Sequence, residues 1–478
     1  MAFLTPDLNP ALAEIVLGSG ICVVLLADLF ISDRWRDLTF AIAMAVLVAT
    51  AWVAGGIGLN GVEITFDGSF IADPLARVLK LLSALVVAVV FLYSRAYLKD
   101  RDIYKGEYYL LGLFALLGIF VMISAYSMLT MYLGLEMLSL SLYALVAFDR
   151  ESPVAAEAAI KYFVLGAIAS GCLLYGMSII YGVTGSLLLP EINAALLQSG
   201  PNDIVALVGL AFIMVGIAFK FGAVPFHMWL PDVYQGAPTC VTLFIGTAPK
   251  LGALALAIRV LFEGLGPIAT SWEAMLTVLA VLSLGIGNVV AIVQTSMKRM
   301  LAYSTIGHVG FIFLGLLAGT EAGLEASLFY TIVYVMMAAA AFGVLILMSR
   351  RGFDADALDD FKGLNERSPW FAAIMMLVMI SMIGVPPLAG FYAKWWVLAA
   401  ILDQGHLWLA VTAVMFSVIG AFYYLRILKL MYFDEPENVI ELDAPFDMRL
   451  VLSINGALLL AIGLFPDRLI AICAGVFP

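Results

Sequence analysis

The sequence is poor in charge: only 12% of its 478 residues are Asp, Glu, Lys or Arg, while 64% are hydrophobic. A soluble domain carries about 25% charged and about 45–50% apolar residues, so this composition excludes a water-soluble globular protein. The solvent that remains is lipid, in which only helices and closed barrels satisfy every backbone polar group. Apolar runs of about 20 residues, continuous rather than alternating, predict membrane-spanning helices.

Cysteine is also scarce, and its spacing excludes two kinds of site. The four cysteines (Cys22, Cys172, Cys240 and Cys473) lie far apart, mostly inside apolar runs. They form no CxxC pair and no metal-binding spacing, so we interpret them as small buried residues. The first apolar run, residues 11–31, has no basic segment before it and is predicted to be a permanent span rather than a cleaved signal peptide.

Motifs for nucleotide or redox chemistry are missing too. The chain has no GxGxxG, no Walker loop and, among its three histidines, no pair placed to bind haem. We therefore predict no cofactor and no metal in this chain. The energy for any transport must come from an ion gradient or from attached subunits. A net charge of −11 also argues against nucleic acid as a partner.

The apolar runs amount to about fourteen candidate spans. Basic residues gather in the loops after odd-numbered spans, such as Arg34 and Arg36 after the first and Arg95 and Lys99 after the third. Loops after even-numbered spans hold almost none, although the loop after the seventh also lacks them. Because cytoplasmic loops are enriched in Lys and Arg, both termini are predicted to face away from the cytoplasm.

Two long apolar segments are interrupted by glycine and proline. The seventh span ends in Gly222-Ala223-Val224-Pro225, with Pro231 following, and the twelfth contains Gly384-Val385-Pro386-Pro387. Such residues free backbone groups in mid-helix. The breaks lie five spans apart, an odd offset, so any repeat that relates them is inverted. Paired broken helices in inverted repeats point to a transport site near the bilayer midplane, although Gly and Pro are also common in membrane helices generally.

Several cations lie inside predicted spans rather than in loops. Arg77, Arg259 and Arg468 are near span ends and are predicted to extend their charged groups towards water, while Lys80 stays ambiguous. Four lysines lie deeper: Lys161, Lys220, Lys250 and Lys394. Together they would cost on the order of 10–14 kcal/mol on an insertion scale, so they need partners, hydration or neutralisation.

Neutralisation makes lysine useful as a proton carrier. Burial lowers the pKa of a lysine and a nearby carboxylate raises it, so a movable counter-charge switches its proton affinity. Arginine stays protonated and cannot do this. Alternatives remain at two sites. Lys161 has Glu157 four residues before it and could form only a surface ion pair, and Trp395 and Trp396 beside Lys394 could mark a membrane interface.

One carboxylate and two histidines join the candidate set. Glu136 lies in the middle of the fifth span and needs a partner from another span, for which Lys220 or Lys161 is the natural candidate; a protonated structural Glu is the alternative. His227 follows the first break and could relay protons or be buried and neutral. His308 lies within the tenth span and could connect the repeats or cap a kink.

Three stretches resemble a known family. The run KFGAVPFHMWLPDVYQGAPT from Lys220, the run YSTIGHVG from Tyr303 and the run GLEMLSL from Gly134 are similar to motifs of the antiporter-like subunits of respiratory complex I, the NADH–quinone oxidoreductase. The likeness covers essentially the whole chain. One departure is Cys240, where relatives commonly have proline, and it casts doubt on no candidate proton site.

The resemblance implies an all-α polytopic membrane protein of about 14 helices, with discontinuous helices 7 and 12 and inverted five-helix repeats in helices 4–8 and 9–13. The corresponding ranges are 1–105 for helices 1–3, 106–265 and 270–433 for the repeats, and 445–478 for helix 14. Its implied proton path comprises Glu136, Lys161, Lys220, His227, Lys250, His308 and Lys394. Glu136 and Lys220 would be a switchable charge pair and Lys250 the central relay.

The same resemblance implies the setting. The chain would be a non-redox subunit in a bacterial inner membrane, beside other antiporter-like and small membrane subunits and lipid, with FMN, iron–sulfur clusters and quinone in partner subunits. An Mrp-type cation/proton antiporter subunit and a structural scaffold are the competing interpretations. The sequence leaves open the direction of proton transfer and the choice between H⁺ and Na⁺.

Overall fold

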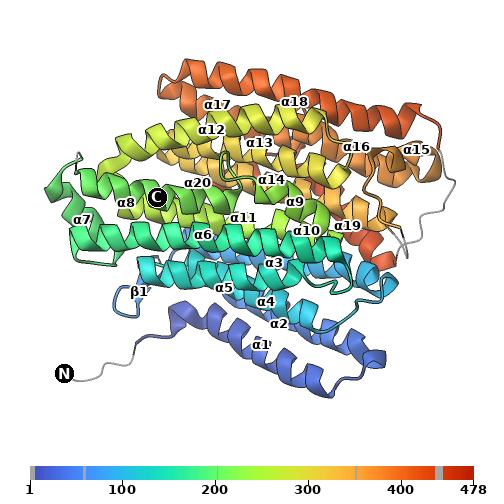
Figure 1. Cartoon of the computed structure of the whole chain (residues 1–478), viewed down its shortest axis with the longest axis horizontal. Helices are drawn as coiled ribbons and strands as arrows, with labels where there is room; N and C mark the ends of the chain where they lie inside the picture. The colour runs from blue at the N-terminus through green and yellow to red at the C-terminus, as the bar shows by residue number, and fades with distance from the viewer. Residues whose placement is uncertain (1–5, 57–60, 202, 350–352, 437–444, 478) are drawn as a thin grey trace.

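Long helices that run side by side make up nearly the whole molecule (Figure 1). The computed structural model describes residues 6–56, 61–201, 203–349, 353–436 and 445–477. The extreme ends, residues 1–5 and 478, lie outside this range, so the side of the membrane on which they lie stays a prediction.

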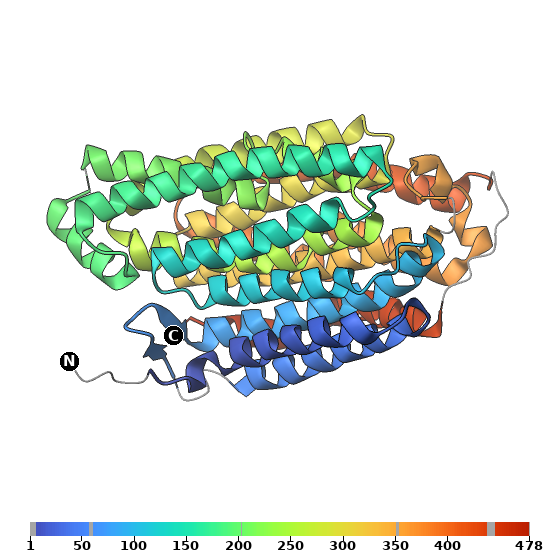
Figure 2. The same ribbon diagram turned by 60° about the horizontal axis from the view of Figure 1, so that its bottom comes forward.

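The first part of the chain forms a layer on one side of the bundle (Figure 2). It comprises α1 (Leu12–Phe30), α2 (Arg36–Gly56), the strands β1 (Glu63–Thr65) and β2 (Phe70–Ala72), and α3 (Pro74–Asp100). The two strands pair antiparallel, with Glu63 opposite Ala72. α3 packs against α2 on one side and against α4, α10, α11 and α14 on the other, so it joins this layer to the rest.

The remaining helices fill the body of the bundle. They are α4 (Glu107–Ile123), α5 (Met128–Val146), α6 (Pro153–Thr184), α7 (Leu189–Ser199), α8 (Ile204–Phe221), α9 (Trp229–Gly236), α10 (Thr239–Gly246), α11 (Ala248–Ile258), α12 (Ala269–Ile292), α13 (Met297–Leu317), α14 (Glu321–Met348), α15 (Leu364–Arg367), α16 (Pro369–Ile383), α17 (Ala389–Asp403), α18 (Leu407–Phe433), α19 (Phe446–Leu464) and α20 (Asp467–Ala474). A π-helical turn, Arg259–Gly264, extends α11.

The prediction of a polytopic helical membrane protein is confirmed. Within the described part of the chain, 12 helical segments are long and apolar enough to cross a membrane. Two shorter apolar helices, Glu107–Ile123 and Pro369–Ile383, coincide with predicted spans four and twelve. The total of fourteen spans and the inverted repeats stay predictions.

Side chains at the helix starts fix many of the boundaries. Asp73, Ser152, Asp203, Ser296 and Thr320 each accept a hydrogen bond from a backbone N–H in the first turn of the following helix. This satisfies donors that the helix itself leaves without a partner. The apolar runs therefore begin as helices where the sequence changes from a polar cap to hydrophobic residues.

Three segments form the centre of the bundle. In Thr239–Gly264, Met297–Leu317 and Glu321–Met348, 94% of the most apolar window is buried, against 28% in the segment Asn9–Phe30. Each central segment carries polar side chains, so these groups face protein rather than lipid. Such groups in a membrane core need partners and are commonly functional.

Charged loops meet at one end of the bundle. Arg101, after α3, forms an ion pair of 2.6 Å with Asp354, after α14, and Arg95 of α3 contacts Asp447 of α19. Tyr104 donates a hydrogen bond to Asp37. Partial burial and this bond raise the pKa of Tyr104 to about 12, so it stays a neutral donor near neutral pH. Basic loops predicted to share one side of the membrane thus lie together.

Candidate functional site

The first predicted helix break lies directly beside Lys220. α8 ends at Phe221, and Gly222 follows with a φ of 75°, which favours glycine. The chain resumes as α9 at Trp229. Pro231, predicted to belong to the break, lies instead in the first turn of α9, where its missing N–H costs no hydrogen bond.

Lys220 contacts a hydroxyl rather than the predicted carboxylate. Its Nζ donates to Ser139 Oγ on α5 at 2.5 Å. Glu136 lies one helical turn before Ser139, so the two share a face of α5. Among the described residues, Glu136 Oε1 is buried without a hydrogen-bond partner. The structure thus brings Lys220 next to Glu136 through Ser139, and their role as a switchable pair stays a prediction.

Lys250 is buried at the end of the same broken helix. Its side chain is on α11, its residue is 1% exposed, and its Nζ donates to the carbonyl oxygen of Phe221 at 2.8 Å. Phe221 is the last residue of α8, so this carbonyl lacks an intrahelical partner. The partial negative charge of a helix C-terminus favours a cation there. The predicted central lysine therefore caps the first break.

The sequence did not reveal a third break that positions Lys250. The eighth predicted span is divided at Thr247, with φ −120° and ψ −95°, between α10 and α11. Pro249 is in the first turn of α11, one residue before Lys250. A proline inside an apolar run was the available signal.

Lys394 repeats the arrangement at the second break. α16 ends at Ile383, and Gly384 has a φ of 87°. Lys394, on α17, donates to the carbonyl oxygen of Ile383 at 2.8 Å and to Ser417 Oγ of α18 at 2.7 Å. It thus combines the carbonyl contact of Lys250 with the serine contact of Lys220. Trp395 beside it is exposed, which fits the alternative that this tryptophan marks a membrane interface.

His308 lies in a cluster of buried hydroxyls. Its Nδ1 is 2.7 Å from the Tyr330 hydroxyl of α14, and its Nε2 is 3.2 Å from the Tyr424 hydroxyl of α18. Tyr424 also contacts Ser304 of α13. His308 therefore connects three helices of the predicted second repeat. Nothing in the sequence distinguishes these hydroxyl groups from the many other tyrosines and serines of membrane helices.

Lys161 lies at the surface, in an ion-pair group. Its side chain is 43% exposed and pairs with Glu157 at 2.9 Å and with Asp232 at 2.8 Å. Asp232 also accepts from Arg299 of α13 at 2.8 Å. The group connects α6, α9 and α13, so it matches the ion-pair alternative and joins the two predicted repeats. Asp232 thus pairs with two cations, Lys161 and Arg299.

Both breaks open towards the side of the bundle. Pro225, next to His227, is exposed, and so are Val385, Pro386 and Pro387. In the described residues, His227 Nδ1 is buried without a hydrogen-bond partner. Irregular backbone at membrane depth is covered by protein or lines a water-filled cavity, so these surfaces are expected to face one or the other rather than lipid.

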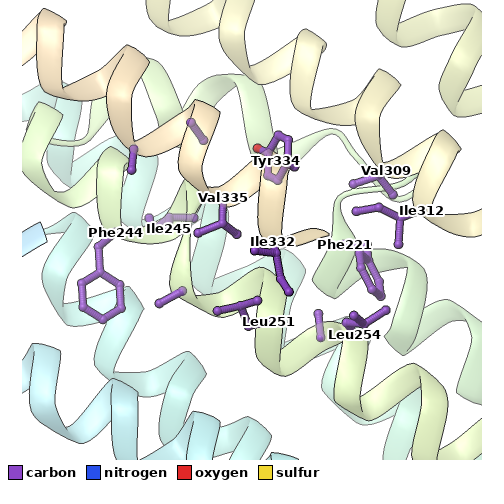
Figure 3. Packing of buried hydrophobic residues seen from close by; sticks show 14 of the residues in the cluster. Phe221, Phe244, Ile245, Leu251, Leu254, Val309, Ile312, Ile332, Tyr334 and Val335 are labelled. Carbon is purple, nitrogen blue, oxygen red and sulfur yellow. The ribbon is translucent and has the colours of Figure 1, made fainter. Parts of the chain in front are cut away.

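An apolar layer lies beside Lys250 and Phe221. Figure 3 shows Phe221 and Leu254 packed with Val309, Ile312 and Ile332, where α8 and α11 meet α13 and α14. The rings of Phe221 and Phe313 are 5.0 Å apart.

A second buried charge cluster joins the first layer to the body. Lys80 of α3 is fully buried and lies 2.6 Å from Glu14 of α1. Arg259 is 1% exposed and contacts Asp73 and Glu263. The prediction that Arg259 extends to water is therefore wrong. Two carboxylates compensate its charge inside the protein: Glu263, four residues further along the chain, and Asp73, which precedes α3.

Replacing Lys80 with methionine is expected to destabilise the protein by about 3–5 kcal/mol, because the Glu14 carboxylate would stay buried without its cation. The measurement is the thermal unfolding midpoint of the purified protein in its native assembly. The matched control is the double variant Glu14→Gln/Lys80→Met, which removes both charges and should recover most of the loss. Equal losses in the single and double variants would contradict this.

The described residues contain no group of three or more His, Cys, Asp or Glu that could hold a metal ion. What the site contains is a series of amines, an imidazole and hydroxyls inside an apolar bundle. Such groups can bind and release protons. Lysine ammonium groups repel other cations while they are charged.

Comparisons with known proteins agree along the whole chain. A family model described as "NADH:quinone oxidoreductase/Mrp antiporter, TM" matches residues 125–420. NADH-quinone oxidoreductase subunit N of Thioalkalivibrio sulfidiphilus is 58% identical, with 99% of each chain covered. Its counterpart in Nitrosomonas europaea is 53% identical, over 99% of this chain and 98% of the relative.

A solved structure is similar as well. A chain of respiratory complex I from Thermus thermophilus with bound Aureothin has 32% sequence identity and a TM-score of 0.83, with 97% of this chain and 100% of that chain covered. The similarity therefore extends over the complete helical bundle.

Proposed function

Because the chain belongs to the NADH:quinone oxidoreductase/Mrp antiporter membrane family, we propose that it is the subunit N type of membrane-arm subunit in an NADH–quinone oxidoreductase, where it translocates protons. The redox chemistry that drives it takes place in partner subunits, which hold FMN, iron–sulfur clusters and quinone. This chain binds none of these groups and contributes the proton path.

The observation that carries the proposal is the placement of three lysines. Lys250 and Lys394 each donate to the last carbonyl of a broken helix, and Lys220 and Lys394 each contact a serine hydroxyl. A buried amine in such a position keeps a hydrogen-bond acceptor in both protonation states. It can therefore gain and lose a proton without leaving an unpaired group, which suits a proton carrier better than a structural cation.

The proposed path runs from Glu136 and Lys220 to Lys250 and on to Lys394. Lys161 and His227 would connect the first half to water, and His308 would connect groups within the second. We propose further that residues 106–265 and 270–433 are inverted repeats, each with one of the breaks beside Gly222 and Gly384. The apolar layer of Figure 3 would then limit proton exchange between them until it hydrates.

Neighbouring subunits belong to the proposal. The exposed breaks at Pro225 and at residues 385–387 would face protein or water rather than lipid, and other antiporter-like subunits and small membrane subunits of the complex would provide the protein cover, with lipid around them. The membrane would be the bacterial inner membrane, with both termini on the periplasmic side. A cysteine-accessibility assay at residues near the ends would test that orientation.

Deletion of the gene is expected to abolish inhibitor-sensitive NADH–quinone oxidoreduction in isolated membranes, because the complex would lack a membrane-arm subunit. Re-expression of the chain from a plasmid should restore it. The family also includes Mrp-type antiporters. If the activity is retained and the cells become sensitive to sodium or alkaline medium, the chain is an antiporter subunit and the proposal is wrong.

A further inference from the structure

A chain of hydrogen-bonding side chains leads away from His308 towards one end of the bundle. Tyr424 OH is 2.5 Å from Ser304 Oγ and 3.2 Å from His308 Nε2, while His308 Nδ1 is 2.7 Å from Tyr330 OH. All four residues are at most 4% exposed. Each imidazole nitrogen thus faces one tyrosine hydroxyl, so a proton accepted on one nitrogen can be released from the other.

The Tyr424 side of this chain approaches water. A crevice of about 450 Å³ opens at the end of the bundle where the basic loops meet, lined by Gln235, Gln294, Ser296, Asp356, Arg426 and Leu430 among others. Arg426 lies two residues after Tyr424 on α18, and it donates to the carbonyl oxygens of Ile292 and Gln294 at 3.0 and 2.8 Å. The crevice therefore begins about 3 Å further along the axis of α18 than Tyr424, on a different side of the helix.

The Tyr330 side of the chain ends at an aromatic ring. Phe311 of α13 stacks on Tyr330 with ring centres 5.5 Å apart, at an interplanar angle of 11°. Lys394 Nζ lies 5.2 Å from the centre of the same Phe311 ring. Phe311 thus contacts both the end of the hydroxyl–imidazole chain and the terminal lysine, and it has no group that could pass a proton.

We propose that Ser304, Tyr424, His308 and Tyr330 form a proton relay between the crevice and Lys394, and that the Phe311 ring is the barrier that closes the relay in this conformation. This inference rests on the proposed function. It adds an entry from the predicted cytoplasmic end directly into the second half of the chain, which does not require a proton to cross the apolar layer beside Lys250.

Each transfer in the relay conserves protons and electrons. Tyr424 gives its hydroxyl proton to His308 Nε2 and takes one from Ser304, which water in the crevice reprotonates. His308 releases the proton on Nδ1 to Tyr330, and Tyr330 gives its own proton to the neutral amine of Lys394, through water once Phe311 moves aside. The imidazole is left as the other tautomer, and reorientation of the ring and hydroxyls restores the starting state.

The test is Tyr424→Phe in the assembled complex, with Tyr108→Phe as the matched control. Tyr108 is on α4, is equally buried, and its hydroxyl also contacts a serine, Ser94, which is not part of the relay. We expect Tyr424→Phe to slow coupled proton translocation about tenfold and Tyr108→Phe to change it by less than about twofold, in line with the loss of a positioned proton-transfer group.

A purely structural role would not change the kinetic isotope effect. In Tyr424→Phe the ratio of rates in H₂O and D₂O should rise, because proton transfer becomes rate-limiting. A normal rate in the assembled variant overturns the relay, and so does a lower rate with an unchanged isotope ratio. If Tyr424→Phe fails to assemble, the test moves to Tyr330→Phe, which removes the hydroxyl at the other imidazole nitrogen. The same two measurements, the rate and the isotope ratio, then decide.

Phe311→Ala tests the barrier. It is expected to increase the passive proton permeability of vesicles that contain the complex, without NADH present, and an unchanged permeability overturns the barrier. The proposed function has its own control in Lys394→Ala. Normal pumping in an assembled Lys394→Ala complex counts against the proposed function, whereas loss of pumping in Lys394→Ala with a normal Tyr424→Phe counts against the relay alone.

Discussion

Lys220→Ala is expected to abolish proton translocation and, with it, most of the coupled NADH–quinone oxidoreduction, while the complex still assembles. Lys220 makes one side-chain hydrogen bond among the described contacts, to Ser139 Oγ. Its removal therefore breaks a single hydrogen bond. It also removes the amine that the described residues place beside Glu136, in the first half of the proposed path. The measurement is the proton uptake of inverted vesicles per NADH oxidised.

A charge-conserving variant separates a proton carrier from a structural cation. Arginine keeps a positive charge and a donor to Ser139, but it stays protonated in proteins. If Lys220 carries protons, Lys220→Arg should pump as poorly as Lys220→Ala. If the charge alone matters, Lys220→Arg should retain most of the activity. Normal pumping in a fully assembled Lys220→Ala complex would refute the assignment of Glu136 and Lys220.

The second large effect is expected for Lys250→Met. Methionine keeps much of the side-chain volume within an almost completely buried site, so the packing of α11 should be preserved. The Phe221 carbonyl loses its donor, at a cost of about 1–3 kcal/mol. Transfer from the first half to the second should stop, because no other lysine among the described residues donates to the Phe221 carbonyl. Pumping by the assembled complex, measured as above, should fall to background.

The neighbouring residue provides the control for Lys250. Leu251 is also on α11, is equally buried and packs in the apolar layer of Figure 3. Leu251→Met makes a similar change without removing an amine, and it should leave pumping near the wild-type level. Equal losses in Lys250→Met and Leu251→Met would mean that packing, rather than proton transfer, explains the effect.

Much of the fold could be predicted because each long apolar run carries its own signal. Two helix breaks were predictable, since a glycine and a proline together end a helix. The residues that indicate them are Gly222 with Pro225, and Gly384 with Pro386 and Pro387. The break at Thr247 was missed although Gly246 and Pro249 flank it, because both lie inside one continuous apolar run that reads as a single span. The β1–β2 pair and α7 were missed as well, because short elements outside the spans leave no hydrophobic period to read.

The candidate site was predictable in its ionisable groups and not in their partners. A lysine such as Lys250 stands out in an apolar helix because its burial is costly. Its hydrogen-bond acceptors, such as the Phe221 carbonyl, come to lie beside the lysine only once the chain has folded. Ser139, Ser417 and Tyr424 gave no signal, because single hydroxyls are common in membrane helices. Arg259 was misjudged because its place near a span end suggested contact with water. Its partner Glu263, four residues later, is visible in the sequence, whereas Asp73 comes close only in the fold.

The contacts of Lys250 and Lys394 with helix-end carbonyls also affect how fast protons can be transferred. A neutral amine keeps two N–H donors and an ammonium has three, so either form can hold the carbonyl of Phe221 or Ile383. The broken helices therefore need not rewind when a lysine changes its charge. Rotations of side chains and water take nanoseconds, whereas shifts of whole helices take about microseconds to milliseconds. A lysine on such a path can therefore bind and release a proton before the helices around it change their arrangement.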